Sequence, residues 1–278
     1  MNLVKRAISL VTERAPDAAH AHPGGALDRA AVEQRLQQAR SLAGLDLSGA
    51  DLRGLDLSGV DLSGAVLRDA DLSDANLAGA QLREATLCGT RLVGAELHGA
   101  GLRDVNCLRT GASRPPDLTG SRLREADLVG ANLAHATLAG ADLTAARLRE
   151  ASLHAADLSG ARLTRAQLDG ADLRHATLVD ASLQGADLTT ADLARARCRA
   201  ADFAGARLVR ANLAGAELAD ADLRGADLGE ATLTDADLRG ARLSGARLTH
   251  ADLDGALLQG AALDEAALDM ADNVPPRP

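Results

Sequence analysis

The sequence has almost no aromatic side chains: in 278 residues it contains no tryptophan, no tyrosine and one phenylalanine, Phe203. Hydrophobic residues nevertheless make up 46% of the chain. A globular core of this length ordinarily includes several aromatic residues, because they bury the largest apolar areas. The interior of this protein must therefore be narrow and filled by small and medium-sized side chains.

The chain also lacks long apolar runs, and its three cysteines are Cys88, Cys107 and Cys198. No stretch approaches the roughly 18 apolar residues that a membrane-spanning helix needs. The first apolar run is followed closely by Glu13 and Arg14, which argues against a signal peptide. The cysteines have no metal-ligand spacing, and their odd number favours a reducing compartment. We therefore expect a cytoplasmic protein without membrane contact.

A five-residue rule occupies most of the chain and is clearest over Ala221–Gly255, which reads ADLRG, ADLGE, ATLTD, ADLRG, ARLSG, ARLTH, ADLDG. A central Leu follows an Ala by two positions, with a polar residue between them. The centre recurs every five residues from Leu42 to Cys107, and again, one residue out of phase, from Leu118 to Leu268. Fixed-period repeats of this kind indicate a solenoid in which each unit contacts its neighbours.

A period of five fits neither an α-helix nor a flat strand, because a helical face repeats about every 3.6 residues and a strand face at every second residue. It does fit a coil that turns a corner every five residues. Leu and Ala then point inward, and the polar residue between them points outward, as in a strand. Corner positions such as Gly49, Gly54, Gly120 and Gly255 need the backbone freedom of glycine. Four units close one turn, giving an all-β parallel β-helix of about 11 coils stacked ~4.8 Å apart.

The A-(D/N)-L-x-x pattern resembles the pentapeptide-repeat family over residues 42–270. The resemblance implies a right-handed quadrilateral β-helix. It also implies, from the family branch that protects type II topoisomerases against quinolones, an acidic dimeric rod that binds DNA gyrase or topoisomerase IV as a DNA mimic.

Five segments are expected. Residues 1–40 break the rule and predict a short α-helical N-terminal cap or hairpin, with one helix near residues 3–11 and another from about Asp28 to Ala39. This segment either covers the first coil or binds a partner. The repeat runs are residues 41–107 and 118–270, separated by a loop insertion at 108–117, and residues 271–278 form a tail.

The insertion and the C-terminal end are candidate contact regions. The loop includes Arg109, Arg114, Pro115 and Pro116, and protruding loops often contain binding residues. A tolerated surface insertion is the alternative. At the far end the rule loses its outward polar residues, so the candidate homodimer residues are Leu257, Leu263 and Leu268. A simple cap or a short terminal helix is the alternative there.

No catalytic or metal-binding constellation stands out from the repeat, so we expect no enzyme activity, no metal and no cofactor. Cys107, Cys198 and Phe203 fall on central positions and replace Leu in the core, whereas Cys88 follows a centre and is expected to be exposed. His135 and His175 lie two turns apart, about 10 Å, which is too far for one metal ion. A convex rod offers no pocket in which carboxylates could be tuned for catalysis.

Charge is distributed unevenly along the rod. The net charge is −9, and residues 211–272 contain 4 basic and 13 acidic residues. This segment spans about 15 Å, over which duplex DNA would present about nine charges. One outward column alternates in sign and predicts a ladder of ion pairs: Asp127, Arg147, Gln167, Asp187, Arg207, Asp227 and Arg247. Another column contains no arginine: Asn132, Ser152, Asp172, Asp192, Asn212, Thr232 and Asp252.

Two functions follow as hypotheses. The first is a DNA-mimicking rod that binds a topoisomerase without touching nucleic acid itself. The second is a rigid scaffold or adaptor that binds its partner through residues 1–40 and 108–117. The candidate partner-binding carboxylates are Asp172, Asp192, Glu217, Asp222, Asp227, Asp237, Asp252 and Asp254.

Overall fold

The computed structural model describes residues 27–107 and 114–266, and every structural statement below concerns these residues. The helix expected near residues 3–11, Arg109, Leu268 and the tail 271–278 lie outside them. Within the described ranges, no helix is long and apolar enough to span a membrane.

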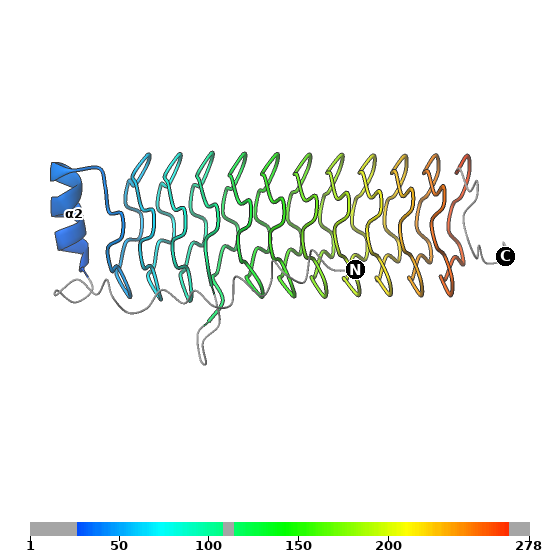
Figure 1. Ribbon diagram of the computed structural model, residues 1–278, viewed down its shortest axis with the longest axis horizontal. Helices are drawn as coiled ribbons and strands as arrows, with labels where there is room; N and C mark the ends of the chain where they lie inside the picture. Colours follow the sequence, from blue (N-terminus) through cyan, green and yellow to red (C-terminus); the bar gives the residue numbers. More distant parts are fainter. Residues whose placement is uncertain (1–26, 108–113, 267–278) are drawn as a thin grey trace, which may run out of the picture.

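The repeat winds into a four-sided parallel β-helix. Single-residue parallel bridges recur every five residues, and each joins a residue to its counterpart on the next turn, from Ser41↔Asp61 to Arg242↔Ala262. Backbone hydrogen bonds join the same turns, as from Leu193 N to Asn212 O at 2.7 Å. Figure 1 shows the turns stacked into a rod. Because each side of a turn pairs through one outward residue, the described chain has isolated bridges rather than longer strands.

The interior is as narrow as the composition requires. Central Leu residues and the Ala residues two positions before them are buried along the rod, which confirms the predicted inward positions. Phe203 and Cys198 occupy central positions and are fully buried. Side chains close-pack this interior, so the outer walls are the surfaces where the protein can meet other molecules.

The corners adopt a left-handed backbone, as the glycine pattern predicts. Gly120 has φ 63°, and residues with side chains also adopt this conformation, as His135 does with φ 63°. An aspartate at a corner constrains the next turn. The Asp220 Oδ1 atom lies 2.7 Å from where a Cβ on Gly240 would be, so the aspartate at one corner favours glycine at the corner above it.

The insertion is shorter than predicted. The bridge Arg91↔Asp117 spans a longer interval than the preceding bridge in its column, Asp71↔Arg91, so this turn contains six extra residues, 108–113. Arg114 already follows the regular path, because its carbonyl oxygen accepts a hydrogen bond from Gly89 N at 2.8 Å. The Pro116 carbonyl accepts from Thr137 N in the same way. Residues 114–117, predicted as loop, therefore belong to the β-helix.

Helix α2 (Arg29–Gln38) lies against the N-terminal end of the rod (Figure 1). Asp28 is its N-cap and accepts a hydrogen bond from Ala31 N at 2.9 Å. Val32 is fully buried, and Leu27 and Leu36 pack against the core. This placement favours the cap interpretation of the segment around α2.

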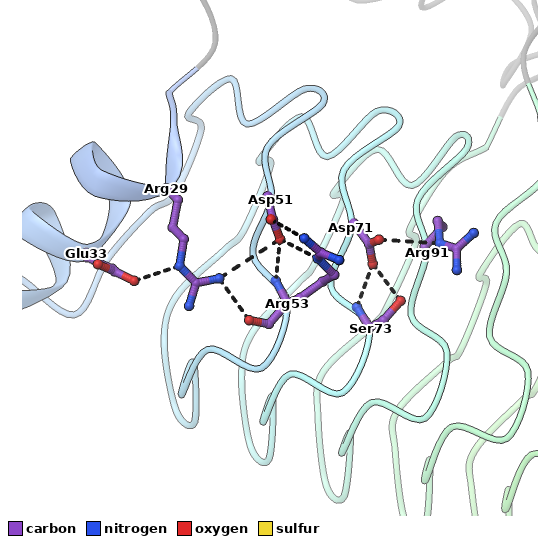
Figure 2. A network of polar contacts seen from close by, with 7 residues as sticks. All are labelled: Arg29, Glu33, Asp51, Arg53, Asp71, Ser73 and Arg91. Carbon is purple, nitrogen blue, oxygen red and sulfur yellow. Dashed lines mark hydrogen bonds and ion pairs between the residues drawn. The ribbon is translucent and has the colours of Figure 1, made fainter.

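Polar contacts attach α2 to one wall of the rod (Figure 2). Arg29 bonds Glu33 within the helix at 2.8 Å and donates to the carbonyl oxygen of Arg53 at 2.9 Å. Arg53 forms an ion pair with Asp51. Asp71 lies on the next turn, and Arg91, one turn farther, lies 3.5 Å from it. The helix thus continues a charged column of the solenoid.

Replacing Asp28 with alanine should destabilise α2 by about 1 kcal/mol, because the helix loses its N-cap. Faster amide exchange should be confined to the helix, since solenoid turns depend on their neighbours. Hydrogen exchange with mass spectrometry measures this. The Asp28→Asn variant keeps the acceptor and should exchange like the parent; equal protection in Asp28→Ala would contradict the capping role.

At the other end, residues 261–266 continue the repeat. Ala262 still bridges to Arg242, and Ala266 N donates to Leu263 O at 3.1 Å as at other corners. The described part of the alternative terminal helix is therefore β-helical, not α-helical.

Candidate functional site

Hydrogen bonds from the local backbone orient the side chains of the outward aspartates. Each accepts a hydrogen bond from the amide two residues later, as from Ser48 N to Asp46 Oδ1 at 3.0 Å and from Ser63 N to Asp61 Oδ1 at 2.9 Å. Hydrogen bonds from Ser48 hold the pKa of the Asp46 carboxyl below its usual value. Asp and Asn suit this position because both offer the required acceptor.

The column that begins at Asp127 forms the predicted ion-pair ladder. Arg147 lies 3.1 Å from Asp127, Arg207 lies 3.6 Å from Asp187, and Arg247 lies 3.5 Å from Asp227. This confirms a structural use of charge on this wall. Of the candidate carboxylates, Asp227 is therefore already paired.

An arginine from outside the column without arginine nevertheless contacts two of its aspartates. Arg174, on the adjoining edge, binds both carboxylate oxygens of Asp172, at 2.8 and 2.7 Å, and lies 3.7 Å from Asp192. Burial raises the pKa of Asp172, but hydrogen bonds from Arg174 outweigh it and leave the pKa lowered. Farther along, Asp252 accepts a hydrogen bond from Asp254 N at 3.1 Å.

Asp222 is the most enclosed candidate. It is 4% exposed and contacts Arg224 and Arg242, each at 2.7 Å. Hydrogen bonds from Arg224 lower the pKa of its carboxyl against the effect of burial. Asp222 thus stabilises its own wall and is not presented to a partner.

One local motif explains the tightest pairs. In Asp-Leu-Arg, the outward Asp and the Arg two residues later lie on the same side of the chain, and the guanidinium takes both carboxylate oxygens. Four such triplets form this clamp: Asp51–Arg53, Asp172–Arg174, Asp222–Arg224 and Asp237–Arg239. The triplet is visible in the sequence and was the signal that would have identified Asp172, Asp222 and Asp237 as clamped.

Glu217 differs from the clamped aspartates. Its side chain is 61% exposed, and Arg197 on the preceding turn lies 3.9 Å away. Asp254 is also exposed. Among the candidate carboxylates, these two are the more accessible to a partner.

Three histidine rings lie side by side along one edge of the rod. His154 lies between His135 and His175, with ring centroids 5.6 Å apart on both sides and the rings nearly perpendicular. His154 is one turn from each of the other two, and comparing His135 with His175 alone did not predict this contact. Within residues 27–107 and 114–266, no group of three or more potential ligands is arranged to hold a metal ion.

The expectation that Cys88 is exposed is wrong. Cys88 is 3% exposed, and the next residue, Gly89, donates to the carbonyl oxygen of Arg114, where the chain returns from the insertion. Cys107 Sγ lies 3.6 Å from the same Arg114 carbonyl oxygen. Cys107 and Cys198 are buried as predicted, and burial raises the pKa of the Cys198 thiol.

The native protein should therefore react slowly with Ellman's reagent at pH 8. Thiol reactivity requires an accessible thiolate, so we expect less than ~10% of the thiols to react before unfolding. Addition of guanidinium should release all three. Rapid stoichiometric labelling of one thiol in the native state would contradict the burial of Cys88.

The remaining predicted contact residues are placed as follows. Arg114 is exposed, Pro115 is half-buried and Pro116 is buried. Leu257 is 41% exposed, and Leu263 is half-buried and packs against the core. Arg114, the first described residue after the insertion, and Leu257 at the C-terminal end are thus accessible.

The repeat also matches the model of a known family. The family model described as "Pentapeptide repeats" matches eight copies, over residues 38–69, 70–106, 117–154, 156–195, 191–229 and 231–269. A search of curated proteins found no match.

Among solved structures, the chain is 36% identical to HetL, a pentapeptide repeat protein involved in heterocyst differentiation regulation from the cyanobacterium Nostoc sp. strain PCC 7120. That match covers 87% of this chain and 95% of HetL, with a TM-score of 0.41. The plasmid-mediated fluoroquinolone resistance protein QnrB1, in a trypsin-treated variant, is 21% identical over 78% of this chain and 89% of QnrB1, with a TM-score of 0.28.

Proposed function

The chain belongs to the pentapeptide-repeat family, whose members fold as right-handed β-helices, and we propose that it acts as a non-catalytic rod that binds another protein. The observation that supports this is the division between inside and outside. The interior is filled by Leu and Ala, while every turn presents charged or polar side chains on its outer walls. A surface of this kind can bind another protein through the charged and polar side chains of an outer wall.

The most specific version of the proposal is a DNA mimic that binds DNA gyrase or topoisomerase IV in the cytoplasm. The acidic segment 211–272 supports it, because a basic DNA-binding surface attracts such a segment over long distances. The clamps limit the likeness to DNA, since Asp222 and Asp237 are neutralised by arginine. Glu217 and Asp254 are left as the more accessible contacts.

Homodimerisation belongs to the same proposal. Leu257 is exposed at the C-terminal end, near Leu263 and Leu268 in sequence, and end-to-end contact of two copies would cover it. Light scattering of the purified chain should give twice the monomer mass, and Leu257→Asp should return it to the monomer.

A supercoiling assay tests the topoisomerase proposal. The purified chain should inhibit gyrase, or protect it from a quinolone, and the effect should weaken steeply as salt rises. Glu217→Gln with Asp254→Asn should reduce the effect, whereas Asp157→Asn with Asp180→Asn, which removes the same charge elsewhere, should preserve it. Supercoiling that is unchanged at every salt concentration, with and without the quinolone, would exclude this partner.

The alternative is a rigid scaffold that binds through residues 1–40 and 108–117. The arginine clamps favour it, because they engage the carboxylates that a DNA mimic would need free. Deletion of residues 108–113 restores the regular turn spacing and should leave the rod folded. If this deletion or removal of residues 1–40 abolishes capture of the partner from the native host, the scaffold is correct; capture that survives both changes supports the acidic-wall proposal.

A further inference from the structure

Two adjoining hollows lie on the wall that contains Glu217. The first, about 670 Å³, is lined by Arg199, Glu217, Ala219, Asp220, Asp237, Arg239 and Gly240. The second, about 490 Å³, is lined by Arg195, Ala214, Gly215, Glu217, Thr234 and Asp235. They share Glu217 and exist because small residues, Ala214, Gly215 and Ala219, occupy the neighbouring edges. The two hollows, which share Glu217 and span three turns, are together called the groove below.

Charge changes sign along this groove. One turn contributes an arginine row: Arg195 and Arg199 line the hollows, and Arg197 lies between them in sequence. The next turn contributes Glu217, which bridges to Arg197, and Asp220. The turn after it contributes Asp235, and also Asp237 and Arg239, which are clamped to each other. Adjacent turns are about 4.8 Å apart, so the step from the arginine row to the carboxylates is one turn wide.

The ion pairs across this step are loose and exposed. Arg199 lies 3.7 Å from Asp220, with side chains 71% and 60% exposed, and Arg197 lies 3.9 Å from Glu217. Clamped pairs on the same rod lie at 2.7 Å, as Arg224 and Asp222 do. Exposed pairs of this kind contribute little stability. A ligand that supplies both charges can therefore replace them at small cost.

We propose that this groove binds an extended segment of a partner protein that has one acidic and one basic side chain two residues apart. Side chains at that spacing lie about 7 Å apart on the same side of a strand. The acidic side chain faces the arginine row, and the basic side chain faces Glu217 and Asp220. A segment with two basic residues would place one of them against the arginine row, so like-charge repulsion selects against it.

This inference rests on the proposed protein-binding function and specifies the partner's chemistry. The probes are fluorescein-labelled threonine-rich peptides with a central Lys-Thr-Glu, Glu-Thr-Lys, Lys-Thr-Lys or Glu-Thr-Glu, and the readout is anisotropy with the full chain. At least one mixed peptide should bind about tenfold more tightly than either single-sign peptide. Glu217→Gln with Asp220→Asn should abolish that preference.

The matched control is Glu230→Gln with Asp187→Asn, which removes two carboxylates that line neither hollow. It should leave the preference unchanged, and circular dichroism should show both variants folded. Equal binding of Lys-Thr-Lys, loss of the preference in the control, or no binding by any peptide at about 1 mM would overturn the proposal. Altered supercoiling without peptide discrimination would reject the groove alone; discrimination without altered supercoiling would reject the topoisomerase alone.

Discussion

Replacement of Phe203 with alanine is expected to lower the free energy of unfolding by about 3–5 kcal/mol. Phe203 is the single phenylalanine of the chain and is fully buried at a position where other turns use Leu. Loss of the ring leaves a cavity that the regular backbone of adjacent turns cannot close, because their hydrogen bonds fix the spacing. Urea unfolding followed by circular dichroism measures the change.

Phe203→Leu is the control, because Leu183 and Leu223 occupy the same column one turn before and after. A Leu should pack there with a change below about 1.5 kcal/mol. If the alanine and leucine variants unfold at the same urea concentration, the interior around Phe203 is not close-packed and the account of the core is wrong.

Acidification from pH 5 to pH 2.5 is expected to lower the melting temperature by roughly 10 °C or more. In the folded rod the carboxyl pKa is lowered at Asp46, Asp61, Asp71, Asp142, Asp172, Asp222 and Asp237. A lowered pKa stabilises the folded state above the unfolded value near 4, and this stabilisation is lost as the pH falls through the folded values. Thermal melts across this range give the slope.

Asp61→Asn with Asp142→Asn provides the matched variant. Asparagine accepts the same backbone hydrogen bond, as Asn76 and Asn212 do from Ala78 N and Ala214 N at 3.1 Å. Stability at pH 7 should change little, while the acid slope should become shallower. A melting temperature that stays constant down to pH 3 in the parent protein would show that the aspartate turns do not contribute as inferred.

The fold was predictable because the residue types in each five-residue unit show which positions point inward, which point outward and which form the corner. Leu and Ala define the inward positions, and the corner glycines, such as Gly120, have the left-handed backbone that the pattern predicts. The alternating column from Asp127 likewise became ion pairs, because the constant length of a turn fixes which side chains meet.

The contacts that could not be predicted join neighbouring positions of different columns. Arg174 lies 3.7 Å from Asp192, outside its own triplet, and His154 lies between histidines that occupy another column. Cys88 is buried next to Gly89, whose amide bonds Arg114, and the path of the chain at Arg114 could be known only after the insertion was placed. The period alone shows which residues share a column. It does not show which long side chains contact residues of another column.

The quarter-turn length of each unit limits how such a chain can change in evolution. Gain or loss of a single unit would keep Leu in the core but rotate every later wall by one side, separating partners such as Asp127 and Arg147. Gain or loss of a whole four-unit turn would preserve both the core and the charge columns. The six extra residues 108–113 fit neither step and leave the later turns in register, as the bridge Arg91↔Asp117 shows. Lengthening by whole turns is thus the change that would alter the reach of the rod and keep its surface pattern.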